Sequence, residues 1–305
     1  MDKDRKRSIS INSIKNKEAR VRLWQQIKHK KKLEKKERRV KKEKARKELG
    51  EDAPPKEIPK MQEDKREYDD TIVTKNDDEV YADEQDDEFE PYFSHKITPK
   101  IMITTGERPC KEAILFVSEL MGMIPNAYYY ERKKFSLIHM CKQAGEKEFT
   151  HLIVVGETHK KVNSLIISHL PTGPTAMFKV MSFVPHEDIA HVGEVTAHNP
   201  ELILNNFTTR LGRRFGRFFG SMYPSQPQFD GRRVVTFHNQ RDYIFVRQHR
   251  YLFENQKKAQ LQELGPRFTL KPRWLQVGTF NNVNGEYEWK FNHKEIETGR
   301  RKWFL

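Results

Sequence analysis

The sequence predicts a folded α/β domain that follows two charged segments. Residues 1–50 carry 21 lysines and arginines against 7 acids, whereas residues 51–96 carry 6 against 17. From residue 97 onwards, apolar runs with strand periodicity alternate with amphipathic helical stretches and then continue as a hairpin, which favours an α/β sandwich with a mixed sheet. We therefore expect a basic arm (1–50), an acidic linker (51–96), a folded domain (97–290) and a C-terminal tail (291–305).

The basic arm is helix-prone, because it contains no glycine or proline before Gly50. Its lysine-rich part, from Lys28 to Lys47, has too few apolar residues to bury a core, so we expect a helix only in a bound state. Nuclear import and a nonspecific grip on RNA phosphates both fit such a run, and a solvated charged segment is the alternative. A small apolar cluster at 21–27 could dock on a protein partner.

The acidic linker opens with the helix-breaking stretch APPKEIP and continues as acids mixed with isolated apolar residues. One interpretation is a solvated tether. The other is a strap whose aromatic residues, such as Phe89 and Tyr92, pin it onto the domain while its acids lie on a basic surface and shield that surface from RNA.

The first part of the folded domain alternates strands and helices. The predicted order is strand 100–105, helix 107–124, short strand 128–130, helix 134–144, interior strand 149–156, and a hairpin of strands 165–170 and 175–183 around the turn PTGP. In the first helix, one buried face is expected from Ala113, Val117, Leu120 and Met121. The connector 184–200 contains three histidines whose spacing does not fit a helical metal site, so we expect them to be solvent-facing.

An arginine-rich helix is the most informative element of the chain. Thr208 or Thr209 is the expected N-cap and Pro224 enforces the stop. A buried stripe follows helical spacing: Leu211, Phe215, Phe218, Phe219 and Met222. Four arginines recur on a second face, and we call them the arginine row: Arg210, Arg213, Arg214 and Arg217.

Like charges at helical spacing destabilise a helix, so the arginine row indicates an anionic partner that the free chain lacks. Phosphate suits this role, because guanidinium groups bind it bidentately. A solvated basic face is the alternative. Gly212, Gly216 and Gly220 form a third line on the helix, and their cost of about 1 kcal/mol each suggests that another backbone approaches closely there.

Two further strands follow the helix. The first opens at Arg232-Arg233, a turn occupies 239–242, and the second runs to Phe253 with apolar residues on both sides, as expected of an interior strand. Basic groups interleaved with aromatic residues are typical of RNA-binding surfaces, although most such aromatics belong to protein cores.

Three blocks carry a family resemblance: ILNNFTTRLG, PQFDGRRVVTFHNQRDYIFVRQHRYLF and LQELGPRFTLKPRWL. They resemble the signature blocks of the Brix-domain family of ribosome-assembly factors, and the similarity extends over roughly residues 60–305. The resemblance implies two similar halves, about 97–184 and 200–290, each like the anticodon-binding domain of some tRNA synthetases. The connector departs from the family pattern, because it carries acids and histidines where lysines and arginines are expected.

The resemblance also implies a function. It indicates a protein of the nucleus and nucleolus that binds pre-ribosomal RNA and supports rRNA processing and assembly of the large (60S) subunit. The implied partners are pre-ribosomal RNA and the assembly factors and ribosomal proteins of the pre-60S particle, with no membrane and no small-molecule substrate. A protein-interaction scaffold, whose basic helix faces acidic protein partners, is the alternative function.

No enzyme signature is present. The motif GRRFGRFFG has the spacing of neither a Walker loop nor a dinucleotide fingerprint. Two cysteines, Cys110 and Cys141, without a CxxC motif argue against a zinc site, and we expect no metal, no cofactor, no signal peptide and no membrane span. The residues predicted to contact RNA are Arg210, Arg213, Arg214, Arg217, Arg232, Arg233, His238, Asn239, Arg241, Arg247, Arg250, Lys271 and Arg273.

Overall fold

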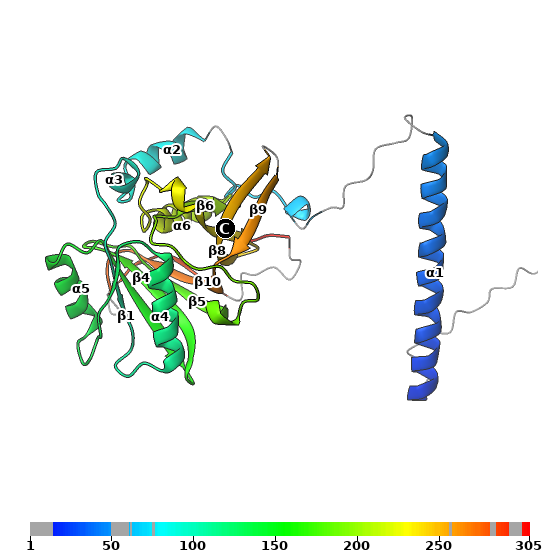
Figure 1. The fold of residues 1–305 in the computed structure, drawn as a ribbon, viewed down its shortest axis with the longest axis horizontal. Coiled ribbons are helices and arrows are strands. Elements are labelled where there is room, and N and C mark those ends of the chain that lie inside the picture. The colour runs from blue at the N-terminus through cyan, green and yellow to red at the C-terminus, as the bar shows by residue number, and fades with distance from the viewer. Residues whose placement is uncertain are drawn as a thin grey trace, which may run out of the picture. The chain divides into compact units, whose positions relative to one another are not determined.

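The computed structural model describes residues 15–49, 61, 63–74, 77–255, 258–280, 285–292 and 301–305, which belong to two units, Met1–Asp64 and Lys65–Leu305 (Figure 1). The predictions for residues 1–14 and 50–60 lie outside this set. In the first unit, α1 (Lys17–Leu49) is one helix of 33 residues that begins where the Asn16 side chain accepts hydrogen bonds from the amides of Glu18 and Ala19. None of its described side chains is buried, as expected of a helix without a core.

The second unit is built on one mixed sheet. Its strands are ordered β2 (Ala127–Tyr129), β1 (Ile101–Thr104), β3 (His151–Thr158), β4 (Lys161–His169), β5 (Thr175–Val184), β10 (Arg267–Gln276), β8 (Tyr243–Asn255), β7 (Arg233–Gln240) and β6 (Glu201–Asn205). In addition, β9 (Lys258–Glu263) pairs with β8, and β11 (Tyr287–Lys290) pairs with β10. The strand pairs β1–β2, β1–β3 and β6–β7 are parallel, and the other pairs are antiparallel.

Two similar halves meet in the middle of this sheet. In the first, β1 leads into α4 (Lys111–Met123), pairs in parallel with β3, and is followed by the antiparallel strands β4 and β5. In the second, β6 leads into α6 (Arg210–Gly220), pairs in parallel with β7, and is followed by the antiparallel strands β8 and β10. The antiparallel pair β5–β10 joins the halves, so the predicted two-half α/β architecture is confirmed.

Two apolar cores define the faces of the sheet. Helices α4 and α6 pack on the same face of the sheet and form one continuous apolar core with it. This core includes Phe116 of α4, Phe215 of α6 and Phe178 of β5. On the opposite face of the first half, α5 (Leu137–Glu146) covers a smaller core around Met140 and Leu152. Among the described residues, no α-helix of this unit covers the corresponding face of the second half, which we call the outer face.

Most predicted helices and strands are present, but the buried face of α4 differs from the prediction. Helix α4 buries Ala113, Val117 and Leu120 as expected, but Met121 is 40% exposed and Phe116 is buried in its place. The C-terminal aromatics pack on the domain, because Trp303 is buried and Trp289 packs against the main core.

The acidic linker forms a strap on the second unit. It contains α2 (Asp78–Gln85) and α3 (Glu90–Phe93), and we call residues 77–93 the acidic strap. Phe89 and Tyr92 are buried, as the strap interpretation requires and a solvated tether does not. Within the described part of the chain, no helix is long and apolar enough to span a bilayer, and no group of three or more metal-ligating side chains is gathered.

Candidate nucleic-acid interface

Helix α6 forms as its sequence predicts. Thr209 is the N-cap, and its hydroxyl accepts a hydrogen bond of 2.9 Å from the Gly212 amide. The apolar stripe is directed into the main core, where Phe215, Phe218 and Phe219 are at most 1% exposed. The arginine row is therefore held on the side of the helix that faces away from the sheet.

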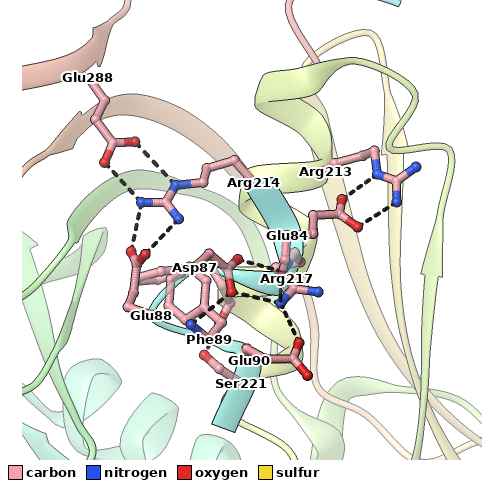
Figure 2. A network of polar contacts seen from close by, with 11 residues as sticks. Glu84, Asp87, Glu88, Phe89, Glu90, Arg213, Arg214, Arg217, Ser221 and Glu288 are labelled. Carbon is pink, nitrogen blue, oxygen red and sulfur yellow. Dashed lines mark hydrogen bonds and ion pairs between the residues drawn. The ribbon is translucent and has the colours of Figure 1, made fainter. Parts of the chain in front are cut away.

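The arginine row is bound by carboxylates of its own chain, as Figure 2 shows for Arg213, Arg214 and Arg217. The pairs are Arg210 with Glu79 at 2.8 Å, Arg213 with Glu84 at 2.6 and 2.7 Å, Arg214 with Glu88 at 2.7 and 3.0 Å and with Glu288 at 3.0 Å, and Arg217 with Asp87 at 2.5 and 2.7 Å. The expectation that the free chain lacks an anionic partner for the row is wrong, because the acidic strap supplies most of these carboxylates. Contact between the row and RNA stays a prediction.

The ion pairs become more buried along the helix. At the start of α6, the side chains of Arg210 and Glu79 are 52% and 75% exposed, whereas those of Arg217 and Asp87 are 17% and 10% exposed. Burial alone would lower the pKa of the Arg214 guanidinium, but its hydrogen bonds with Glu288 and Glu88 outweigh burial and raise that pKa. The arginine row is thus fully charged, and its inner members are held more firmly than its outer ones.

Aromatic rings of the strap lie against three of the guanidinium groups. The contacts are Arg213 over Tyr81 at 5.0 Å, Arg214 over Phe89 at 5.2 Å and Arg217 over Phe93 at 4.5 Å, measured to the ring centroids. Cation–π contacts of this kind add to the ion pairs. The strap therefore recognises the row with the combination of anions and π-faces that RNA would also offer.

The glycine line accommodates the chain itself. A Cβ atom at Gly212 would lie 3.1 Å from the carbonyl carbon of Leu305, and one at Gly220 would lie 2.7 Å from the Phe93 ring. At Gly216 the shortest such distance is 3.8 Å, which is ordinary contact. The predicted close approach of a second backbone occurs at Gly212, and the backbone belongs to the C-terminal residue.

The C-terminal end of the acidic strap contacts two buried histidines. His169 donates from Nδ1 to the Gly173 carbonyl at 2.7 Å, so its Nε2 accepts from the Tyr92 hydroxyl at 2.9 Å. His151 lies beside it and hydrogen-bonds to Ser221 of the α6 C-terminus at 2.9 Å. Burial lowers the pKa of both imidazoles, so both are neutral at pH 7.

Some residues predicted to contact RNA are structural. Arg233 is 4% exposed and donates to the carbonyl oxygens of Thr196, His198 and Gly122, which fixes the connector onto α4. Asn239 is fully buried and exchanges hydrogen bonds with Asn206. Their burial leaves these two side chains no surface for RNA in this fold.

Four other predicted residues lie apart from the row. Arg250 donates to the Glu194 carbonyl at 2.8 Å and, with the exposed Arg232, lines a groove of about 420 Å³ beside β9. Arg247 donates to the main-chain carbonyls of Val246 and Phe268. Arg241 occupies the turn between β7 and β8.

The outer face gathers the remaining predicted residues. His238 on β7 lies directly opposite Phe245 on β8, and Lys271 on β10 lies opposite Lys179 on β5. The ammonium group of Lys271 is 4.6 Å from the ring centroid of Tyr243 and donates to its hydroxyl at 3.2 Å. Lys271 and Arg273 also lie over the ring of Phe291, at 4.7 and 5.2 Å.

The cations of the outer face differ from the arginine row in their partners. Among the described residues, Lys179, Lys271 and Arg273 form no ion pair within 4 Å. The carboxylate of Asp242, in the adjacent turn, is half-buried and accepts from the amides of Phe304 and Leu305, and Lys271 lies close enough to favour its charged form. Two like charges directly opposite one another in a sheet are destabilising, so this face favours an anionic ligand.

Comparisons with known proteins identify the family to which the chain belongs. The family model described as Brix domain matches residues 107–274. The chain is 49% identical to "Ribosome production factor 1" of Pongo abelii over 298 residues, which cover 97% of this chain and 85% of that protein. It is 43% identical to "Probable ribosome production factor 1" of Drosophila melanogaster, covering 97% and 75% of the two chains. A solved structure, "Crystal structure of probable ribosomal biogenesis protein from Aeropyrum pernix K1", is 16% identical with a TM-score of 0.44 and covers 57% of this chain and 96% of that one. The chain belongs to the Brix-domain family.

Proposed function

We propose that this protein is a ribosome-assembly factor that binds precursor ribosomal RNA of the large (60S) subunit and acts by positioning it, without catalysis. The names of its relatives support a role in ribosome production. Because of that role, we expect the protein in the nucleus, within the nucleolus. The single observation that carries RNA binding is the pair Lys179–Lys271, two facing cations beside aromatic rings on a sheet face that no described α-helix of the unit covers.

The outer face has the chemistry that single-stranded RNA requires. Cationic side chains neutralise phosphates, and exposed rings stack on unpaired bases. Tyr243 is 37% exposed and Phe245 is half-buried, so both have ring surface available. Because bases stack on any aromatic face, we expect binding with a limited sequence preference.

The arginine row is a weaker candidate for the first contact with RNA. Its guanidinium groups already hold carboxylates of the same chain, so a phosphate would have to displace them. The same fact argues against the scaffold alternative, since acidic protein partners would meet a row that is already neutralised.

A salt titration of RNA affinity tests this proposal. The probe is a labelled single-stranded 20-mer from a large-subunit precursor, measured by fluorescence anisotropy. If Lys179 and Lys271 each neutralise one phosphate, the variant Lys179→Glu/Lys271→Glu lowers the slope of log K against log salt by about 1.4, at about 0.7 for each contact. Removal of the ring in Tyr243→Ala weakens binding by about 1–3 kcal/mol.

The matched control carries the same charge change elsewhere in the unit. Lys160→Glu/Lys161→Glu alters two exposed lysines of the β3–β4 turn and should leave the slope near that of the wild type. Equal losses in the two double variants would mean that only net charge matters, and unchanged affinity in Lys179→Glu/Lys271→Glu would overturn the assignment of the outer face.

A further inference from the structure

The acidic strap is fixed at its two ends. On the N-terminal side, Ile72 forms a β-bridge with Thr209, and the Val73 amide donates to the Thr208 carbonyl at 2.9 Å. On the C-terminal side, Phe89 and Tyr92 are 0% and 4% exposed. Neither end can leave the domain without exposing core residues or breaking main-chain hydrogen bonds.

Helix α2, which lies between these anchors, is held much more weakly. Its only buried residue is Val80. Its remaining contacts with α6 are mainly polar: the pairs of Arg210 with Asp77 and Glu79 and of Arg213 with Glu84, and a hydrogen bond of 2.7 Å from Arg217 to the Glu84 carbonyl. The Tyr81 ring also lies under Arg213. The Arg210–Glu79 pair is exposed and contributes little to stability. The Arg213–Glu84 pair is part-buried, with side chains 28% and 18% exposed, and is the main contact that must break for α2 to lift while both anchors stay in place.

The contact between α2 and α6 is not closely packed. An open groove of about 260 Å³ lies between them, lined by the four arginines of the row and by Val80 and acids of the strap. Guanidinium groups bind carboxylate and phosphate in the same bidentate geometry. A phosphate that enters this groove would meet arginines already arranged for it.

From this arrangement we infer that α2 is an intramolecular lid on a second polyanion site, the outer part of the arginine row. In the free chain, the lid carboxylates occupy Arg210 and Arg213. RNA phosphates replace them, α2 lifts, and the anchors at 71–73 and 89–92 remain. The lid is a tethered competitor whose effective concentration is set by the short linkers on either side, so it excludes weakly bound anions and admits a polyanion held nearby.

This inference rests on the proposed function in one respect, which is that the natural ligand is RNA. Lid opening has its own readout, because α2 amides are protected when α2 is closed and exchange when it is open. Inorganic polyphosphate serves as a second probe that offers phosphates without bases. A failure of RNA binding at the outer face is therefore distinguishable from a failure of the lid.

The test compares two double variants of the strap with the same change of charge. Glu79→Gln/Glu84→Gln removes the lid carboxylates that bind the row, whereas Asp78→Asn/Asp86→Asn removes two strap carboxylates that form no ion pair among the described residues. We expect the first variant to bind both polyphosphate and the RNA 20-mer about fivefold to tenfold more tightly than wild type, and the second to change affinity less than twofold.

Hydrogen–deuterium exchange of the wild-type chain completes the test. With saturating polyphosphate, amides of 79–85 should lose protection while those of Tyr92 and Ser94 keep it. Equal tightening in both double variants would reduce the effect to net charge and overturn the inference. Unchanged affinity in Glu79→Gln/Glu84→Gln, or protection at 79–85 that persists in the bound state, would also overturn it.

Discussion

Two alanine substitutions in α6 should have opposite effects on stability, although they make the same chemical change. In Gly216→Ala, the new methyl group meets only ordinary contacts of 3.8 Å or more, so the gain in helix propensity of up to about 1 kcal/mol is retained. In Gly212→Ala, the methyl group would lie 3.0 Å from the Thr209 hydroxyl and 3.1 Å from the Leu305 backbone. Overpacking of this kind costs about 1–3 kcal/mol, which exceeds the propensity gain.

Urea denaturation of the two variants measures these effects. We expect the free energy of unfolding to rise by about 0.5–1 kcal/mol in Gly216→Ala and to fall by about 1 kcal/mol in Gly212→Ala. A double-mutant cycle with deletion of Leu305 isolates the cause: in the shortened chain, Gly212→Ala should lose most of its penalty. Equal stabilisation by both alanines would refute the close approach of the C-terminus to α6.

Three further predictions concern the strap and its surroundings. Phe89→Ala should destabilise the domain by about 3–5 kcal/mol because the ring is fully buried, whereas Phe93→Ala, at a ring 37% exposed, should cost much less. Chemical denaturation compares the two variants, and similar losses of stability would contradict the role of Phe89 as an anchor of the strap. Arg217→Ala should destabilise by up to about 3 kcal/mol because it removes the ion-pair partner of a carboxylate that is only 10% exposed, and thermal unfolding at two salt concentrations should show a loss that salt barely alters. Burial lowers the pKa of His151 and His169, so the unfolded state binds more protons below its own pKa of about 6.5 and stability falls as the pH drops. Between pH 7.5 and 5.5, each histidine should lower the free energy of unfolding by up to about 1.4 kcal/mol. A free energy of unfolding that stays constant over that range would contradict their neutral state.

Local patterns in the sequence predicted the elements well. Helix α6, its Thr209 cap and its apolar stripe follow from spacing and capping chemistry, which depend on neighbours in the chain. The exposed position of Met121 could not be predicted in this way, because the buried face of α4 depends on how the helix rotates against the sheet and places Phe116 in the core.

The partners of the candidate site were harder to predict, because they come from distant parts of the chain. Lys179 was not among the predicted contacts, since only the pairing of β5 with β10 brings it beside Lys271. For the arginine row, composition indicated an anion but could not choose between RNA and the chain's own acids. The signal for the second choice was the alternation of acids and aromatics in the strap.

Mapping of RNA crosslinks on the free chain tests the central claim most directly. The chain is irradiated with a single-stranded large-subunit precursor fragment at low protein concentration, and crosslinked peptides are identified by mass spectrometry. We predict crosslinks at Tyr243 and Phe245 on the outer face, with or without additional ones at Arg210 and Arg213. Crosslinks confined to residues 210–217, with none on the outer face, would contradict the account.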